Sequence, residues 1–329
     1  MQKCIVVLGM HRSGTSALMG VLNILGVDLG LTLMKRAEGN PKGFFENDHI
    51  TQVNDKILRG LISSWDDVFS LPENWCDQEC LKQYKEETVG IMKNEFRGDI
   101  FGIKDPRMSK LLPFWNGIFE ELNIKPYHLI TLRNPLEVAN SLEKRNKFST
   151  EKSTVLWMNY MLDAEFHSRN YPRAFISFDE LLNNPEKIIN KISKTFNINF
   201  PKVYPYIKGD IEQFLEPSLK HYTFKSDDKN ESLLECISDY YHLLQDLANE
   251  ENLFKKGENN ENKMSKIDEI RKYFLMISRY FYNADITDIK KNVLQKDQLI
   301  QELLNSISWK LTKPFREIQS FLKSVFSLH

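Results

Sequence analysis

A chain of 329 residues with 41% hydrophobic residues is long enough for one α/β domain with a sizeable core, plus an extension. Its 44 basic and 45 acidic residues give a formal net charge of −1, which argues against a nucleic-acid-binding protein. Cys76 and Cys80 are one helical turn apart, with no second cysteine pair or histidine near them. Reduced thiols are therefore expected rather than a zinc site.

The beginning of the chain predicts where the protein is located. We expect the first strand to start at residue 3 or 4, which leaves no room for a signal peptide. No apolar run approaches the length needed to span a membrane. The sequence therefore predicts a cytoplasmic protein, in the compartment where nucleotide cosubstrates are made.

The first element predicts a phosphate-binding loop. Residues 4–8 read as a buried parallel strand, and helical spacing begins at Thr15. The spacing from Gly9 to Gly14 matches the front of a Walker A loop, but Thr15 stands where the Walker lysine is required. The loop has its positive charge at Arg12 instead, which indicates a phosphate cradle not built for a triphosphate.

Residues 27–48 are expected to form a loop that ends where a helix begins at Asn47 or Asp48. The predicted apolar face of that helix consists of Ile50, Val53, Ile57 and Leu61. Glu46 lies at the junction, beside two aromatic residues that would partly desolvate it and raise its pKa. Two interpretations of Glu46 stay open, a helix-capping residue or a general base.

Residues 66–98 are predicted to be helical, and residues 100–104 to form another buried strand. Lys104, Asp105 and Arg107 then fall at the carboxyl end of that strand, where open α/β sheets bind ligands. The alternative is a strand-end turn with a local ion pair.

A further strand is predicted to end at Arg133, with Asn134 as a helix cap and Pro135 at the first helical position. Arg133 at the strand end and Ser141 two turns into the helix can converge on one site. A guanidinium group and a hydroxyl suit a phosphate dianion, and the alternative is a surface arginine beside a cap. Arg145 either contacts the same phosphate or is solvated.

Beyond this strand, a helix is predicted from about residue 153 to residue 168. A strand from Arg173 leads to Phe178, with Asp179 as a cap and a new helix from Pro185.

Two of these motifs resemble those of sulfotransferases that use 3′-phosphoadenosine 5′-phosphosulfate (PAPS). The run from His11 to Ser16 resembles their 5′-phosphosulfate loop. The spacing from Arg133 to Ser141 is similar to their 3′-phosphate motif. The Lys104-Asp-Pro element resembles that of tyrosylprotein sulfotransferases, and the similarity, to a bacterial-type member, covers residues 3–250.

The resemblance implies a three-layer P-loop-type domain with a central parallel sheet flanked by helices, and no metal is expected. It implies that the cosubstrate is bound by Arg12, Ser13, Gly14, Thr15, Ser16, Arg133, Ser141 and Phe178. Phe178 stands where the family has a tyrosine near the adenine. The implied catalytic residues are Glu46 as base, Lys104 at the sulfuryl group and Arg12 at the leaving phosphate. His11 and His221 are further acid/base candidates.

The predicted domains are residues 1–252 as the nucleotide-binding catalytic domain, residues 253–266 as a linker and residues 267–329 as a helical extension. A seven-residue repeat in the extension suggests a coiled coil or a helix folded back on the domain; it consists of Ile286, Val293, Ile300 and Ile307. The last stretch, from residue 308, resembles a tail of bacterial surface-glycan enzymes. Apolar and basic residues there fit a membrane surface, a partner or the chain's own domain.

The sequence therefore predicts a cytoplasmic sulfotransferase, or one peripheral at the inner face of the membrane. It would move a sulfuryl group from PAPS to a hydroxyl acceptor, with a carbohydrate of a cell-surface glycan expected by analogy. The C-terminal helices are expected to mediate either peripheral membrane contact or self-association. One alternative is a P-loop kinase of a small molecule or sugar. The other is a non-catalytic nucleotide-binding adaptor of a glycan-modifying complex. Residues 215–222 resemble a segment of bacterial members and have no assigned role.

Overall fold

The computed structural model describes residues 1–35, 42–215, 233–250, 258–283, 295–296 and 298. The chain divides into two compact units, Met1–Met276 and Ile277–His329. The first unit contains the sheet and the predicted phosphate-binding motifs, whereas the heptad positions and the tail fall within the second. None of the helices in the described ranges is both long and apolar enough to cross a membrane.

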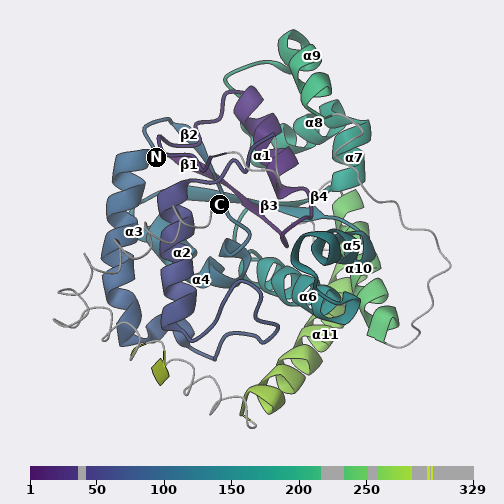
Figure 1. Cartoon of the computed structure of the whole chain (residues 1–329). Coiled ribbons are helices and arrows are strands. Elements are labelled where there is room, and N and C mark those ends of the chain that lie inside the picture. Colours follow the sequence, from purple (N-terminus) through teal and green to yellow (C-terminus); the bar gives the residue numbers. More distant parts are fainter. Residues whose placement is uncertain (36–41, 216–232, 251–257, 284–294, 297, 299–329) are drawn as a thin grey trace, which may run out of the picture. The chain divides into compact units, whose positions relative to one another are not determined.

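The described part of the first unit is built on a parallel four-stranded sheet, which confirms the predicted α/β class (Figure 1). The strand order is β2-β1-β3-β4, and each neighbouring pair is parallel. The strands are β1 (Lys3–Leu8), β2 (Ile100–Lys104), β3 (Lys125–Leu132) and β4 (Arg173–Ser177).

Side chains of β1 alternate between two apolar cores, because successive residues of a strand point to opposite faces. Cys4, Val6 and Leu8 belong to one core, whereas Ile5 and Val7 belong to the other. The sheet is therefore buried on both faces, which explains why its strands are almost continuously apolar rather than alternating.

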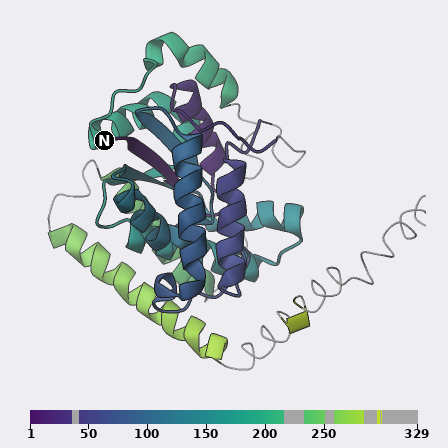
Figure 2. The same ribbon diagram turned by 90° about the vertical axis from the view of Figure 1, so that its left-hand side faces the viewer.

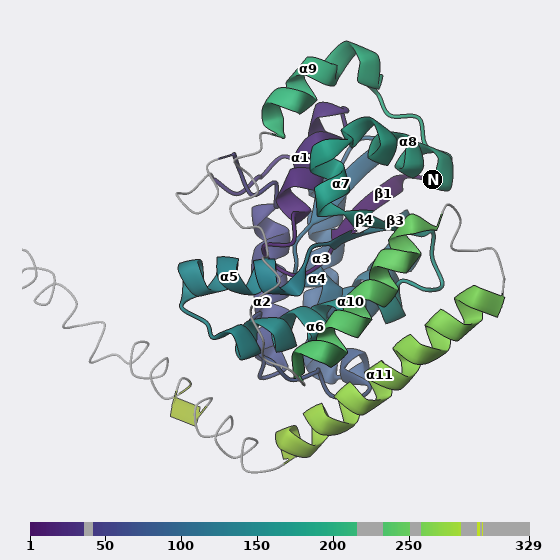
Figure 3. The ribbon, with the colours of Figure 1, turned by 90° about the vertical axis from the view of Figure 1, so that its right-hand side faces the viewer.

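Helices cover both faces, which gives the predicted three layers (Figure 3). The first face is covered by α2 (Asp48–Gly60), α3 (Lys82–Glu95), α4 (Met108–Glu121), α5 (Pro135–Asn146), α6 (Thr150–His167) and α10 (Leu233–Asn249). The second face is covered by α1 (Thr15–Ile24), α7 (Phe178–Asn183), α8 (Pro185–Phe196) and α9 (Tyr204–Phe214). Helices α2 and α3 lie side by side (Figure 2).

Several predicted helix caps are present. The Asn47 side chain accepts a hydrogen bond from the Ile50 amide, and the Asn134 side chain accepts one from the Leu136 amide. Asp179, however, is not a cap, because Ser177 occupies that position and accepts from the Glu180 amide. Asp179 instead lies in the first turn of α7, where its carboxylate still faces the positive end of the helix dipole.

The prediction that residues 66–98 are helical is wrong for its first part. Helical structure there is confined to α3 and to the short helices η1 (Trp75–Asp77) and η2 (Glu79–Leu81). Between residues 66 and 74 the backbone carbonyls bond to side chains of other helices. The Lys110 ammonium donates to the Asp67 carbonyl at 3.0 Å, and the Asn159 amide donates to the Phe69 carbonyl at 3.0 Å. These long-range bonds replace the local bonds of a helix.

Helix α11 spans Glu258–Asn283, so its first turns fall within residues 253–266, to which the sequence assigns a linker. The four heptad positions from Ile286 to Ile307 and the tail from residue 308 lie outside the described residues, as does His221. The domain boundaries, the coiled coil and the membrane-surface tail stay predictions.

His128 should make the protein acid-sensitive. Its ring on β3 is fully buried, lies edge-on to Tyr171, and has no hydrogen-bond partner among the described residues. Burial, followed by the charge of Arg173, lowers the pKa of His128 to about 3. The unfolded ring has an ordinary pKa near 6.5, so between these two values only the unfolded state binds the proton. Stability should therefore fall as pH drops through that window, by at most about 1.4 kcal/mol per pH unit for this proton.

His128→Leu should flatten this pH dependence, measured by urea denaturation at several pH values between neutral and acidic. The matched control is His242→Gln on α10, where the ring is exposed. Parallel stability curves for the parent protein and His128→Leu would show that His128 is not the group responsible.

Candidate functional site

The loop between β1 and α1 is closely packed against two other elements. Gly9 and Gly14 both have positive φ, at 135° and 90°. A Cβ atom on Gly9 would lie 2.4 Å from the Thr131 hydroxyl oxygen of β3. One on Gly14 would lie 2.2 Å from the Phe178 ring at the start of α7. Both positions therefore require glycine for conformation and for space.

Arg12 and Ser141 meet at this loop. Arg12 also has a positive φ, at 70°, which is uncommon for a residue with a side chain. Its Nε donates a hydrogen bond to the Ser141 hydroxyl at 2.8 Å, and its carbonyl accepts one from Arg133 at 3.1 Å. The structure thus brings together both halves of the predicted phosphate site, although they are more than 120 residues apart.

Arg133 is buried and held from several sides. Its Nε is 3.0 Å from the Glu137 carboxylate one helical turn away, and its guanidinium carbon is 4.9 Å from the centroid of the Phe178 ring. Its Nη2 is buried and has no hydrogen-bond partner among the described residues. A buried cationic donor without an acceptor is costly, so the site suits a ligand with anionic oxygens.

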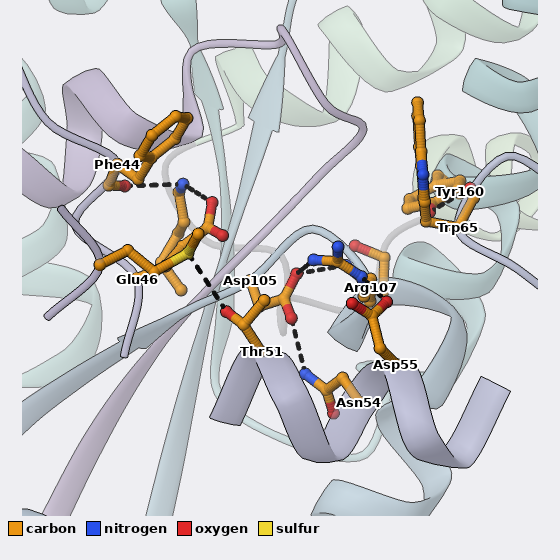
Figure 4. A network of polar contacts seen from close by, with 12 residues as sticks. Phe44, Glu46, Thr51, Asn54, Asp55, Trp65, Asp105, Arg107 and Tyr160 are labelled. Atoms are coloured by element: carbon orange, nitrogen blue, oxygen red, sulfur yellow. Dashed lines mark hydrogen bonds and ion pairs between the residues drawn. The ribbon is translucent and has the colours of Figure 1, made fainter. Parts of the chain in front are cut away.

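Lys104 and Glu46 form a buried ion pair at the edge of the same site (Figure 4). Their side chains are 2% and 8% exposed. The Lys104 ammonium also donates to the Phe44 carbonyl at 2.8 Å, and the Ser16 hydroxyl of α1 donates to that carbonyl at 3.3 Å. Burial raises the pKa of Glu46, and the positive charge of Lys104 opposes that shift. The direction is the one expected from the sequence for a general base.

A second polar network fixes the turn that follows Lys104 (Figure 4). The fully buried Asp105 carboxylate accepts from the Asn54 amide of α2 at 2.8 Å, and from the backbone and side chain of Arg107 at 3.0 and 2.9 Å. Arg107 also pairs with Asp55 at 2.6 Å. The end of β2 is therefore joined to α2, the helix that begins two residues after Glu46.

These groups line one cavity of about 420 Å³. The sequence-predicted residues in its wall are His11, Arg12, Gly14, Thr15, Ser16, Glu46, Lys104, Arg107, Arg133, Arg145 and Phe178. Ser13 is fully buried, and Ser141 reaches the cavity only through Arg12. Wall residues that no motif singled out include Met34, Lys42, Thr51, Trp65 and Asn146. Met34, Lys42 and Trp65 are on loops, whereas Thr51 is on α2 and Asn146 ends α5. No local pattern of the sequence shows that these side chains meet at one cavity.

His11 is less suited to acid catalysis than its position suggests. Its ring lies edge-on to Trp65, with the ring centroids 4.7 Å apart. Burial, and then the charges of Arg107 and Arg145, hold the pKa of His11 well below its ordinary value. The ring is therefore neutral at neutral pH and has no proton to donate as an imidazolium. Arg145 stacks over Trp65, 5.5 Å from the ring centroid.

No protein-family model and no curated protein sequence matches the chain. Among solved structures, it is similar to the sulfotransferase domain of the olefin synthase of Synechococcus PCC 7002, with a TM-score of 0.45 and 13% identity over 74% of this chain and 96% of that one. It is also similar to the sulfotransferase domain of the curacin biosynthetic pathway, with a TM-score of 0.40 and 15% identity over 73% of this chain and 97% of that one. Both similarities are distant.

Gly14→Ala should destabilise the protein by about 1–3 kcal/mol, since it combines a left-handed backbone with a clash against Phe178. Adding Phe178→Leu should relieve the clash, so the double variant should lose less free energy of unfolding than the sum of the single variants. Urea denaturation measures all three.

The control is Gly117→Ala within α4, where a Cβ atom would meet nothing within 4 Å. It should stabilise the helix by up to about 1 kcal/mol. Strictly additive losses for Gly14→Ala and Phe178→Leu would contradict the close packing of the loop against that ring.

Proposed function

We propose that this protein transfers a sulfuryl group from PAPS to a hydroxyl acceptor. The proposal is carried by the contact between Arg133 and the Arg12 carbonyl, which joins two anion-binding elements in one cavity. PAPS has phosphate groups at two ends, and a site for it needs two such elements. A loop of Walker-like spacing without the Walker lysine fits this cosubstrate better than a nucleoside triphosphate.

Each end of PAPS has a proposed set of partners. Arg12 and the backbone amides of residues 14–16 face the 5′-phosphosulfate, at the positive end of the α1 dipole. The Ser13 amide instead donates to the Met10 carbonyl at 3.1 Å, within the loop. Arg133 and Ser141 bind the 3′-phosphate, and the buried Nη2 of Arg133 is the donor that this phosphate would satisfy. Phe178 supports both sets, because its ring contacts the Arg133 guanidinium and the backbone at Gly14. Its contact with the adenine stays a prediction.

The proposed chemistry uses the buried ion pair. Glu46 accepts the proton of the acceptor hydroxyl while the acceptor oxygen forms a bond to sulfur. The bond from sulfur to the 5′-phosphate oxygen breaks, and Arg12 and the loop amides stabilise the charge that develops there. Lys104 neutralises the sulfuryl oxygens in transit. We further propose a cell-surface glycan as the acceptor, by analogy alone.

A kinase would need a cation where Thr15 stands, and Thr15 is buried against the loop. A non-catalytic nucleotide-binding adaptor of a glycan-modifying complex would have no need of a desolvated Glu46 beside Lys104. Neither alternative has a specific observation in its favour.

Calorimetry with adenosine 3′,5′-bisphosphate, ADP and ATP, with and without magnesium, tests the cosubstrate. We expect preferential, magnesium-independent binding of the 3′,5′-bisphosphate. Arg133→Ala should weaken this binding roughly 10- to 100-fold, because charge-assisted hydrogen bonds to phosphate are lost. Arg59→Ala, at an exposed position of α2, is the matched control and should bind as the parent protein does. Equal or tighter binding of Mg-ATP would overturn the proposal and favour the kinase.

Glu46→Gln should lower turnover by about 10²–10⁴-fold while the affinity for adenosine 3′,5′-bisphosphate is retained. The parent rate should rise with pH as Glu46 ionises, with a midpoint above the ordinary carboxyl value of 4.5, since burial raises its pKa. The variant should lack this acidic limb. Turnover of the parent protein and of the variant, at each pH, is measured as release of the bisphosphate from PAPS, with water or methyl glycosides as acceptors.

Glu143→Gln, exposed on α5, is the control for removing a carboxylate from a helix near the site. Unchanged turnover in Glu46→Gln would remove Glu46 as the base and leave the cosubstrate proposal standing.

A further inference from the structure

Glu95, the last residue of α3, collects hydrogen bonds from the loop that precedes α2. Its side chain is 5% exposed. One carboxylate oxygen accepts from the backbone amides of Leu31 at 2.8 Å and Thr32 at 2.9 Å, and from the Asn47 side chain at 2.7 Å. The other oxygen accepts from the Thr32 hydroxyl at 2.9 Å and is 2.9 Å from Nδ1 of His49. No sequence motif indicated this residue.

The carboxylate form of Glu95 is what these donors require. Burial on its own would raise the pKa of Glu95, but the hydrogen bonds from Thr32, Asn47 and Leu31 outweigh it and lower the pKa to about 2. Glu95 is therefore ionised throughout the working range of pH. A glutamine would keep only one accepting oxygen and would direct an amide group at donors.

The donors belong to two segments that are paired with each other. Leu33 and Asn47 form an isolated antiparallel bridge. The Met34 amide donates to the Glu46 carbonyl at 2.8 Å, and the Asp48 amide donates to the Thr32 carbonyl at 2.8 Å. Glu95 bonds to both segments of this pair, at Thr32 and at Asn47. It therefore fixes the backbone on either side of Glu46.

Glu46 depends on such support because it lies outside the helices and strands itself, on the loop that leads into α2. Lys104 is on β2, whereas Glu46 is on the loop, directly after Phe45, whose φ is 54°. We infer that Glu95 is a positioning residue, which holds the loop so that Glu46 meets Lys104 in the cavity. This inference rests on the proposed role of Glu46 as the base. Glu95 itself is not among the residues that line the cavity.

Glu95→Gln tests the inference by three measurements on the full chain. Hydrogen exchange of the amides in residues 31–35 and 42–48 should accelerate. Affinity for adenosine 3′,5′-bisphosphate should be retained, because Arg133 and the phosphate loop are not held by Glu95. Release of the bisphosphate from PAPS, with water or methyl glycosides as acceptors, should fall about 10- to 100-fold, as expected for a displaced catalytic group.

The matched control is Glu165→Gln on α6, another buried carboxylate, which pairs with Arg169 at 2.7 Å and Arg173 at 3.0 Å away from the loop. It should lower the thermal midpoint, with exchange in residues 31–35 and 42–48 and turnover both unchanged. Equal effects of the two variants on turnover would mean that Glu95 contributes only general stability, which would overturn the inference.

Thr32 gives a second pair of variants if Glu95→Gln does not fold. Thr32→Val removes one bond to the carboxylate and should show a smaller change in the same direction, and Thr32→Ser should restore the parent behaviour. Unchanged hydrogen exchange of these amides in both Glu95→Gln and Thr32→Val would overturn the inference that Glu95 holds the loop. Failure of the parent protein to bind the bisphosphate would instead refute the proposed function. Hydrogen exchange would still show whether Glu95 holds the loop.

Discussion

The position of β1 between β2 and β3 determines the site. Val7 of β1 is in register with Lys104 of β2, and Leu8 is in register with Ile130, three residues before Arg133. Parallel strands end at the same edge of a sheet, so the loop after β1 lies between the lysine of one neighbour and the arginine of the other. Arg12, Lys104 and Arg133 come from segments that are well separated in the sequence, and each reaches the same cavity from its own strand end or loop.

The cost of this arrangement is desolvation. A buried ion pair such as Lys104 and Glu46 loses several kcal/mol of hydration per ion, which is recovered only with good geometry and further hydrogen bonds. The Phe44 carbonyl supplies one such bond to the lysine, while Asp105 and Glu95 fix the backbone on the two sides of the pair. The polar residues around the cavity thus hold the charged groups of Lys104 and Glu46 in place.

The sequence was sufficient for the elements whose signals are local. Strand ends, the glycine loop and the Asn134 cap all follow from neighbouring residues, and the structure places them as expected. It was insufficient where a distant side chain decides the backbone. The loop held by Lys110 and the segment held by Glu95 are examples, because their bonding partners are more than 40 residues away. Trp65 enters the cavity wall by the same route, since its carbonyl accepts from Tyr160 at 2.6 Å.

The support of Arg133 by Glu137 and Phe178 has a thermodynamic consequence. A solvated arginine carries about 2 kcal/mol of rotamer entropy that a ligand must remove on binding. Here the guanidinium group is already confined by a carboxylate, a ring and a backbone carbonyl. Folding has therefore already removed the conformational freedom of the Arg133 side chain. Binding of a phosphate to its Nη2 should carry little further loss of side-chain entropy.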